Sequence, residues 1–197
     1  ASGEIGRPCI LRITNRDPDF PSMDFLRVSG GIFLDLAIHD FDMVRFQMGE
    51  VEEIYAMGGV LINPALNEFG DIDTDVVVLR FANGAVGTID NSRKAVYGYD
   101  QRLEMFCSNG TAMANNEAET TVVKGNTAGF LSAKPPYFFM QRYAPCYVEE
   151  VRQFVECVRD DKPTPTNGED GRAAVVLGYA AWKSLRENRP VKISEIG

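Results

Sequence analysis

The chain has 197 residues, of which 45% are hydrophobic and 24% charged, with a formal net charge of −8. These are ordinary values for a globular domain that can bury a core. The acidic balance argues against nucleic acid or an anionic membrane surface as a main partner and leaves a small neutral substrate open. Apolar stretches are interrupted by charges within about ten residues, too short to span a bilayer.

Four cysteines and one histidine limit the metal and redox chemistry of the sequence. No two cysteines stand at CxxC spacing, and a single histidine disfavours a Cys/His zinc site. This usage is typical of free thiols in a reducing cytosol, and no secretory signal is recognisable. We therefore expect one domain over residues 1–197 of a cytoplasmic protein without a metal site.

Hydrophobic periodicity predicts strand, loop and helix in the first quarter of the chain, then a run of strands. Residues 5–14 predict a strand, 15–29 a loop, and Gly31 to about Met48 a helix that Gly49 ends. Asn83-Gly84 and Asn109-Gly110 each predict a hairpin turn, because both residue types tolerate positive φ. The result is a meander of six or seven antiparallel strands, with segments at 51–62, 73–82, 85–92, 101–107, 111–115 and 119–124.

The last third reads as helical. Pro145 suits a first helical turn, and apolar residues follow at helical spacing from Val148 to Val158. Thr166 to Glu169 matches a capping box before a final helix that runs to about Glu187, and residues 191–193 predict a closing strand.

This order of elements predicts an α+β fold, with an open, largely antiparallel sheet and helices packed on one face. No βαβ alternation is present, and no GxGxxG follows a strand. The Gly30-Gly31 and Gly58-Gly59 pairs are isolated. The sequence therefore shows no dinucleotide fingerprint.

The most informative segment spans residues 30–43, where Asp35, His39 and Asp42 interrupt an apolar run. On a continuous helix, spacings of four and seven place these side chains on one face. A helix that is apolar on its other sides should be largely buried, and a buried carboxylate needs a partner. We expect His39 to be that partner for Asp35.

Two interpretations of this pair stay open. Asp35 and His39 can form a structural pair, or Asp35 can cap the helix. Alternatively, His39 can exchange a hydroxyl proton as a general acid–base while the carboxylate orients its ring. The Gly30-Gly31 turn favours the second interpretation, since it would let a ligand approach the backbone. A metal site would need Asp40 or Asp42 as a further ligand, and nothing else in the sequence supports one.

Residues 30–42 resemble the signature of the glucose–fructose oxidoreductase / inositol dehydrogenase (Gfo/Idh/MocA) family, in which a Gly-Gly turn precedes an Asp and a His four residues apart. Members have an N-terminal Rossmann domain and a C-terminal, dihydrodipicolinate-reductase-like α+β domain with an open sheet. The likeness covers nearly the whole chain. Segments 14–18, 90–93 and 97–102 are similar to the inositol 2-dehydrogenase branch, as is 168–171.

The resemblance implies roles for named residues. His39 would take the proton from an alcohol while hydride passes to a nicotinamide, and Asp35 would orient His39. Tyr99, Asn15 and Asp17 would contact substrate hydroxyls. From the residues alone, Tyr99 could equally pack in the sheet, and Asn15 and Asp17 could form turns.

The family also uses a lysine from a Glu-Lys-Pro motif at the end of a Rossmann strand, and this sequence has no such motif. Residues 1–6 look like the join just after the Rossmann domain. We therefore expect an N-terminal domain of about 100–150 residues to be missing. That domain would bind NAD or NADP, and a residue within it would decide between the two.

The resemblance thus implies the substrate-binding and proton-transfer half of a dehydrogenase for myo-inositol. A glucose-type sugar, a deoxysugar or scyllo-inositol are the alternative substrates. A second hypothesis is non-catalytic, in which the domain mainly joins subunits into a homo-dimer or homo-tetramer through its sheet face.

Overall fold

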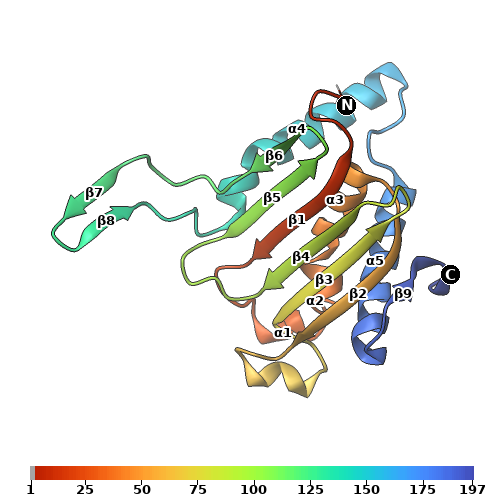
Figure 1. Ribbon diagram of the computed structural model, residues 1–197, viewed down its shortest axis with the longest axis horizontal. Helices are drawn as coiled ribbons and strands as arrows, with labels where there is room; N and C mark the ends of the chain where they lie inside the picture. Colours follow the sequence, from red (N-terminus) through yellow and green to blue (C-terminus); the bar gives the residue numbers. More distant parts are fainter. Residues whose placement is uncertain (1–2) are drawn as a thin grey trace.

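A computed structural model describes residues 3–197, so Ala1 and Ser2 of the expected domain join lie outside the described residues. An open seven-stranded sheet with the order β6-β5-β1-β4-β3-β2-β9 carries helices on one face (Figure 1). The α+β prediction is confirmed. The strands are β1 (Pro8–Arg16), β2 (Val51–Gly59), β3 (Thr74–Phe81), β4 (Val86–Ser92), β5 (Asp100–Cys107), β6 (Gly110–Ala114) and β9 (Val191–Lys192).

The sheet is not a simple meander, because β1 is inserted between β4 and β5. It runs antiparallel to β5 and parallel to β4. Leu11 and Ile13 on β1 face the covered side and belong to the hydrophobic core. The strand also continues through Asn15 and Arg16, which pair with both neighbours, so the prediction that a loop begins at Asn15 is wrong.

The single helix expected from Gly31 to Met48 is two helices, α2 (Ile32–Asp35) and α3 (Ile38–Met48). Between them, the amide of Ala37 donates to the carbonyl of Ile32 at 2.9 Å, a bond that spans five residues instead of four. Phe33, Ala37 and Phe41 are all fully buried around this wider turn. Packing of both segments into the core therefore overrides the uniform helical spacing of the sequence.

Other boundaries differ in smaller ways. The helix expected at Pro145 is α4 (Phe139–Asp160), with Pro145 inside it. The last helix is α5 (Gly168–Glu187). Asn167 is its N-cap and Asp170 completes the capping box, one residue later than the pattern of Thr166 and Glu169 predicts. Short elements complete the chain: α1 (Met23–Leu26), η1 (Pro64–Glu68), the separate hairpin β7 (Val123–Asn126) with β8 (Gly129–Ser132), and η2 (Ile193–Glu195).

The two faces of the sheet differ in what covers them. On one face α3 packs against α5 and β1, and α5 packs against β2, around buried residues such as Phe41 and Leu177. On the other face Val76, Val78 and Phe106 are exposed. The sheet is therefore covered on one side and open on the other (Figure 1).

Candidate functional site

One edge of the sheet gathers polar side chains because of the strand directions. The parallel strands β1 and β4 end at this edge, and their antiparallel neighbours β5 and β3 begin there. The register places Asn15 beside Asn91 and Gln101, and Asn91 beside Asp75. Side chains in one row across a sheet lie on the same face. This row lies where Leu11 and Ile13 of β1 are also buried, and α3 lies above it.

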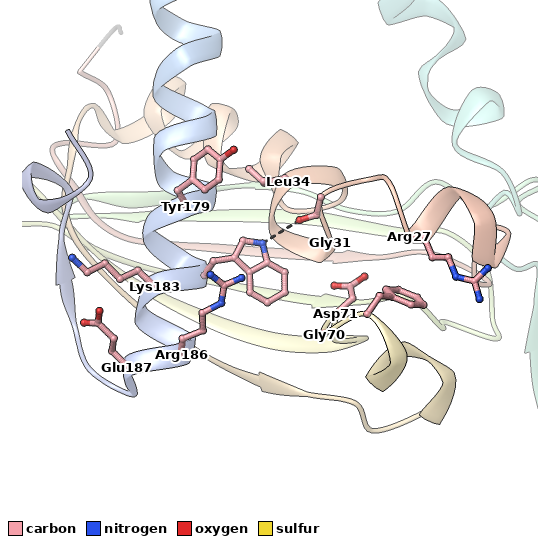
Figure 2. Close-up of a pocket in the computed structure, with 12 residues that line it drawn as sticks. Arg27, Gly31, Leu34, Gly70, Asp71, Tyr179, Lys183, Arg186 and Glu187 are labelled. Atoms are coloured by element: carbon pink, nitrogen blue, oxygen red, sulfur yellow. Dashed lines mark hydrogen bonds between the residues drawn. The ribbon is translucent and has the colours of Figure 1, made fainter.

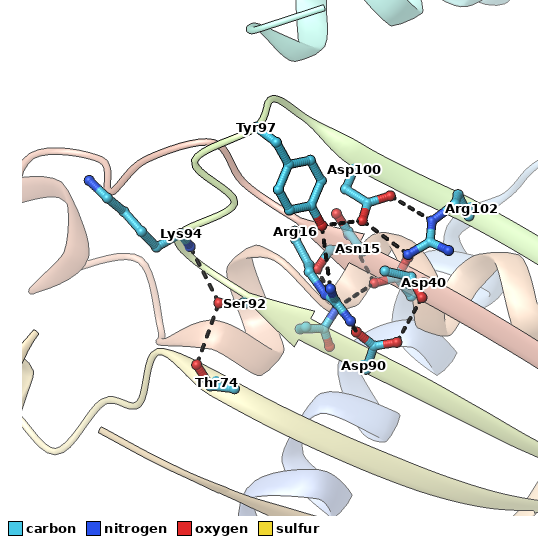
Figure 3. Close-up of polar contacts among 12 residues, drawn as sticks. Asn15, Arg16, Asp40, Thr74, Asp90, Ser92, Lys94, Tyr97, Asp100 and Arg102 are labelled. Atoms are coloured by element: carbon cyan, nitrogen blue, oxygen red, sulfur yellow. Dashed lines mark hydrogen bonds and ion pairs between the residues drawn. The ribbon is translucent and has the colours of Figure 1, made fainter. Parts of the chain in front are cut away.

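Asp40 of α3 is the centre of this row. Its carboxylate accepts a hydrogen bond at 2.9 Å from the amide of Asn15, which Figure 3 shows beside it. It also accepts from the amides of Asn91 at 2.9 Å and Gln101 at 3.2 Å. Burial raises the pKa of Asp40 to about 6, and the three amide donors oppose that rise. From the sequence, the only role expected of Asp40 was that of a possible metal ligand. Its place beside His39 in an apolar helix was the available signal.

Asp35 does not pair with His39, so that expectation is wrong. The Asp35 carboxylate accepts a hydrogen bond at 2.8 Å from Arg93, which follows β4 and is fully buried. His39 is exposed near the start of α3, and within residues 3–197 its imidazole makes no hydrogen bond. The charge of an imidazolium at His39 lowers the pKa of the neighbouring Asp40. The structure therefore leaves the imidazole accessible to a ligand.

Asp17 and Tyr99 lie at the same edge. Burial raises the pKa of Asp17 to about 6; Arg93 opposes the rise, and the charges of Asp35 and Asp40 add to it. Asp17 is partly exposed, and its carboxylate accepts no hydrogen bond from the described residues. Tyr99 is nearly buried, packs edge-to-face on Tyr143 with ring centroids 5.9 Å apart, and burial raises its pKa.

Of the predicted substrate contacts, Asn15 is the most enclosed. Its side chain is 1% exposed and its amide is directed at Asp40. The Tyr99 hydroxyl donates to Oε1 of Gln101 at 3.5 Å, and the amide nitrogen of Gln101 donates to Asp40. The structure thus joins Asn15 and Tyr99 to one hydrogen-bonded network around Asp40, while the carboxylate of Asp17 stays outside this network with unused acceptors.

A second polar network supports this edge from the open face (Figure 3). Asp90 accepts from Thr14 and from Nε of Arg16, both at 2.7 Å. Arg16 also donates to Tyr97, which in turn donates to Asp100. These bonds tie β1, β4, β5 and the loop between β4 and β5 together. They bring segments 14–18, 90–93 and 97–102, which are far apart in the sequence, into contact.

The Gly30-Gly31 turn faces the protein interior instead of a ligand. A Cβ on Gly31 would lie 2.5 Å from Trp182 and 2.7 Å from Oδ1 of Asp71. Figure 2 shows Asp71 close to Gly31 at the wall of a hollow of about 530 Å³. This hollow lies between α5 and residues 69–71 and is not lined by His39, Asp35 or Asp17. The candidate site is therefore assigned to the edge of the sheet, where these three chemically active side chains lie, and not to the hollow.

The described residues do not fit a dinucleotide. The parallel pair β1/β4 has no glycine-rich turn leading from a strand into a helix, which is what holds a pyrophosphate. Residues 3–197 likewise contain no group of three or more His, Cys, Asp or Glu side chains placed to hold a metal ion. No helix in that range is long and apolar enough to cross a membrane.

Comparison with known proteins places the chain in a family. Residues 1–113 match the GFO/IDH/MocA C-terminal domain. The chain is 54% identical to the myo-inositol 2-dehydrogenase of Thermotoga maritima, over 99% of this chain and 59% of that protein. It is 40% identical to the inositol 2-dehydrogenase of Rhizobium meliloti, over 98% and 58% respectively. The chain therefore belongs to the Gfo/Idh/MocA family and corresponds to the C-terminal part of these relatives.

Solved structures agree with this assignment. A probable dehydrogenase from Thermotoga maritima superposes with a TM-score of 0.96 at 54% identity, over 99% of this chain and 59% of that chain. A putative myo-inositol dehydrogenase from Sinorhizobium meliloti gives 0.94 at 39% identity, over 97% and 58%. The chain thus spans less than two thirds of the relatives it matches.

The raised pKa of Asp40 predicts a pH-dependent stability. An acid whose folded pKa is above its ordinary value of 3.8 contributes stability below about pH 4 that is lost as the pH rises through 6. Asp40→Asn removes this loss, because asparagine does not ionise. Gln101 can rotate its amide so that its oxygen accepts from the new NH2 group. The free energy of unfolding of Asp40→Asn minus that of the wild type should therefore rise by about 2–3 kcal/mol between pH 4 and 7.

Denaturant unfolding of the 197-residue chain at several pH values measures this difference. Other acids with raised pKa values, such as the buried Asp75, are common to both proteins, so their contributions largely cancel. Asp24→Asn is the matched control, because the Asp24 side chain is 94% exposed, and its difference curve should stay flat. A flat curve for Asp40→Asn as well would contradict the assigned pKa.

Proposed function

We propose that this chain is the substrate-binding and proton-transfer domain of an NAD(P)-dependent dehydrogenase that oxidises a secondary alcohol of a cyclic polyol, most specifically myo-inositol at C2. The parent enzyme, in this proposal, joins the chain to a dinucleotide-binding domain. The proposal is supported by the family, by relatives named as inositol 2-dehydrogenases, and by the site's geometry.

One observation carries the proposal: an accessible imidazole lies among carboxylates at the edge of the sheet. His39 is exposed, Asp17 has unused acceptor atoms, and Asp35 keeps one oxygen outside its bond to Arg93. Carboxylate oxygens accept hydrogen bonds from hydroxyls. A ring that carries many hydroxyls would meet several acceptors here, together with an imidazole that can accept and return a proton.

The chemistry of this chain is limited to binding and proton movement. A bound nicotinamide cofactor supplies the hydride acceptor. The Asp17 and Asp35 carboxylates bind and orient ring hydroxyls, and His39 accepts the proton of the reacting hydroxyl and returns it in the reverse direction. Asp40 lies behind His39, fixed by three amides, and stabilises the imidazolium electrostatically. Asn15 and Tyr99 act through this network.

Formation of NADH from myo-inositol and NAD⁺ by the parent enzyme tests the proposal. Scyllo-inositol, glucose and a deoxysugar are compared in the same assay, and NADP⁺ replaces NAD⁺ in a parallel one. Turnover of a sugar but not of an inositol would mean that the enzyme belongs to the sugar dehydrogenases of the same family. Absence of turnover with every polyol would refute the proposal. The 197-residue chain alone should form no NADH.

The open face of the sheet supports a second role as an oligomerisation platform. Val76 and Val78 of β3 and Phe106 of β5 are 45–48% exposed on that face, where no helix covers them. Exposed apolar patches of this kind mark association surfaces. We expect the 197-residue chain to form a dimer or tetramer in light scattering without cofactor, and Val78→Glu to make it monomeric. A monomeric wild type would argue against the platform.

A further inference from the structure

Arg93 is a fully buried cation that the proposed chemistry does not use. It follows β4, and its Nη1 donates to Oδ2 of Asp35 at 2.8 Å. Its Nη2 lies 3.7 Å from Oδ2 of Asp71, an ion pair longer than a hydrogen bond. Burying a guanidinium costs desolvation free energy, which is compensated only when carboxylates lie in favourable positions around it. One side chain thus faces two carboxylates that are 36 residues apart in sequence.

Asp71 itself holds the start of α2. Its Oδ1 accepts hydrogen bonds from the amides of Ile32 at 2.9 Å and Ile72 at 2.8 Å. Ile32 is the first residue of α2 and Asp35 is the last. Asp71 therefore holds one end of the helix and Arg93 holds the other, and the two side chains face each other. Figure 2 shows Asp71 directly below the Gly31 turn that leads into α2.

Arg93 and Asp71 together form what we call the α2 clamp. Such a clamp is needed because α2 is too short to be stable by itself. It has four residues, and its N-cap, Gly31, offers no side chain to cap it. An isolated helix of this length is not stable in water. The rigid, planar fork of an arginine can reach two carboxylates in fixed directions, which a lysine ammonium does less well.

We propose that Arg93 is a positioning residue that, together with Asp71, holds α2 and directs the carboxylate of Asp35 towards the substrate. This inference rests on the proposed function. Arg93 binds one oxygen of Asp35, and the described residues donate no hydrogen bond to the other. The Asp35 side chain is 22% exposed, so that oxygen is reachable. Arg93 also offsets the negative charge of Asp17 and Asp75, whose pKa values it lowers.

Steady-state kinetics of the parent enzyme with myo-inositol and NAD⁺ test the clamp. Arg93→Ala should lower kcat about 10²-fold, the cost of a misplaced catalytic group, and leave the KM for NAD⁺ unchanged. Guanidinium added to Arg93→Ala should restore part of kcat, which a merely structural loss would not allow. Arg93→Lys keeps the charge but not the fork and should lose about tenfold.

Arg45→Ala is the matched control. Arg45 is a mostly buried arginine paired with Glu50 and Asp170 near the end of α3 that lies away from His39, so its kcat should stay at the wild-type value. Hydrogen exchange gives a readout independent of activity. A peptide spanning residues 30–38 should exchange faster in Arg93→Ala and Arg93→Lys than in the wild type, and no faster in Arg45→Ala.

The outcomes separate the clamp from the proposed function. If Arg93→Lys shows wild-type kcat and wild-type exchange of residues 30–38, the clamp is overturned. This test holds even if Arg93→Ala fails to fold. If the wild-type parent enzyme shows no inositol oxidation, the proposed function fails, and exchange in these variants still decides whether Arg93 holds α2.

Discussion

His39→Gln in the parent enzyme should lower kcat for myo-inositol by about 10²–10⁴-fold, the usual contribution of a general acid–base. Glutamine has a polar group of similar reach but cannot accept and hold a proton near neutral pH. The KM for NAD⁺ should be unchanged, because residues 3–197, to which His39 belongs, show no dinucleotide-binding turn. Steady-state rates from pH 6 to 9 measure the effect.

Because His39 is exposed, its substitution should change turnover without changing the stability of the fold. Because its side chain makes no hydrogen bond within residues 3–197, the variant should unfold within about 0.5 kcal/mol of the wild type. Met43→Gln is the matched control, since Met43 lies one turn further along α3 and is also exposed. It should keep the wild-type kcat. A His39→Gln enzyme with unaltered turnover would remove His39 from the reaction.

The location of the candidate site could be predicted from the sequence, but the partners within it could not. The spacing of Asp35 and His39 in an apolar segment drew attention to residues 30–43. Their pairing failed because the turn at Ala37 widens the helix and because Arg93, 58 residues later, supplies the charge for Asp35. No local pattern connects residues so far apart. Only the end of β4 brings Arg93 to α2.

The strand order had the same limitation. Alternation of apolar residues located most strands, because it depends on each strand's own two faces. It does not specify neighbours, so the insertion of β1 between β4 and β5 was missed. Asn15 illustrates the consequence. Asparagine is typical of turns, yet here it is the last but one residue of β1, and its amide is needed by the buried Asp40.

Gly31→Ala should lower the free energy of unfolding by about 2–4 kcal/mol, combining backbone strain with overpacking. Gly31 has a φ of +79°, which an L-residue with a Cβ rarely adopts. The added methyl would also meet Trp182 at 2.5 Å and Oδ1 of Asp71 at 2.7 Å. Neither can move freely, because Trp182 donates to the carbonyl of Gly30 and Asp71 accepts from Ile32.

Gly49→Ala separates the two contributions. Gly49 ends α3 with a φ of +86°, but a Cβ there would meet nothing within 4 Å, so only the strain of about 1–2 kcal/mol remains. Urea unfolding of both variants in the 197-residue chain measures the difference. Equal losses would mean that Asp71 and Trp182 yield at little cost. A larger loss for Gly31→Ala would mean that the start of α2 is rigid, which the geometry of Asp35 at its other end requires.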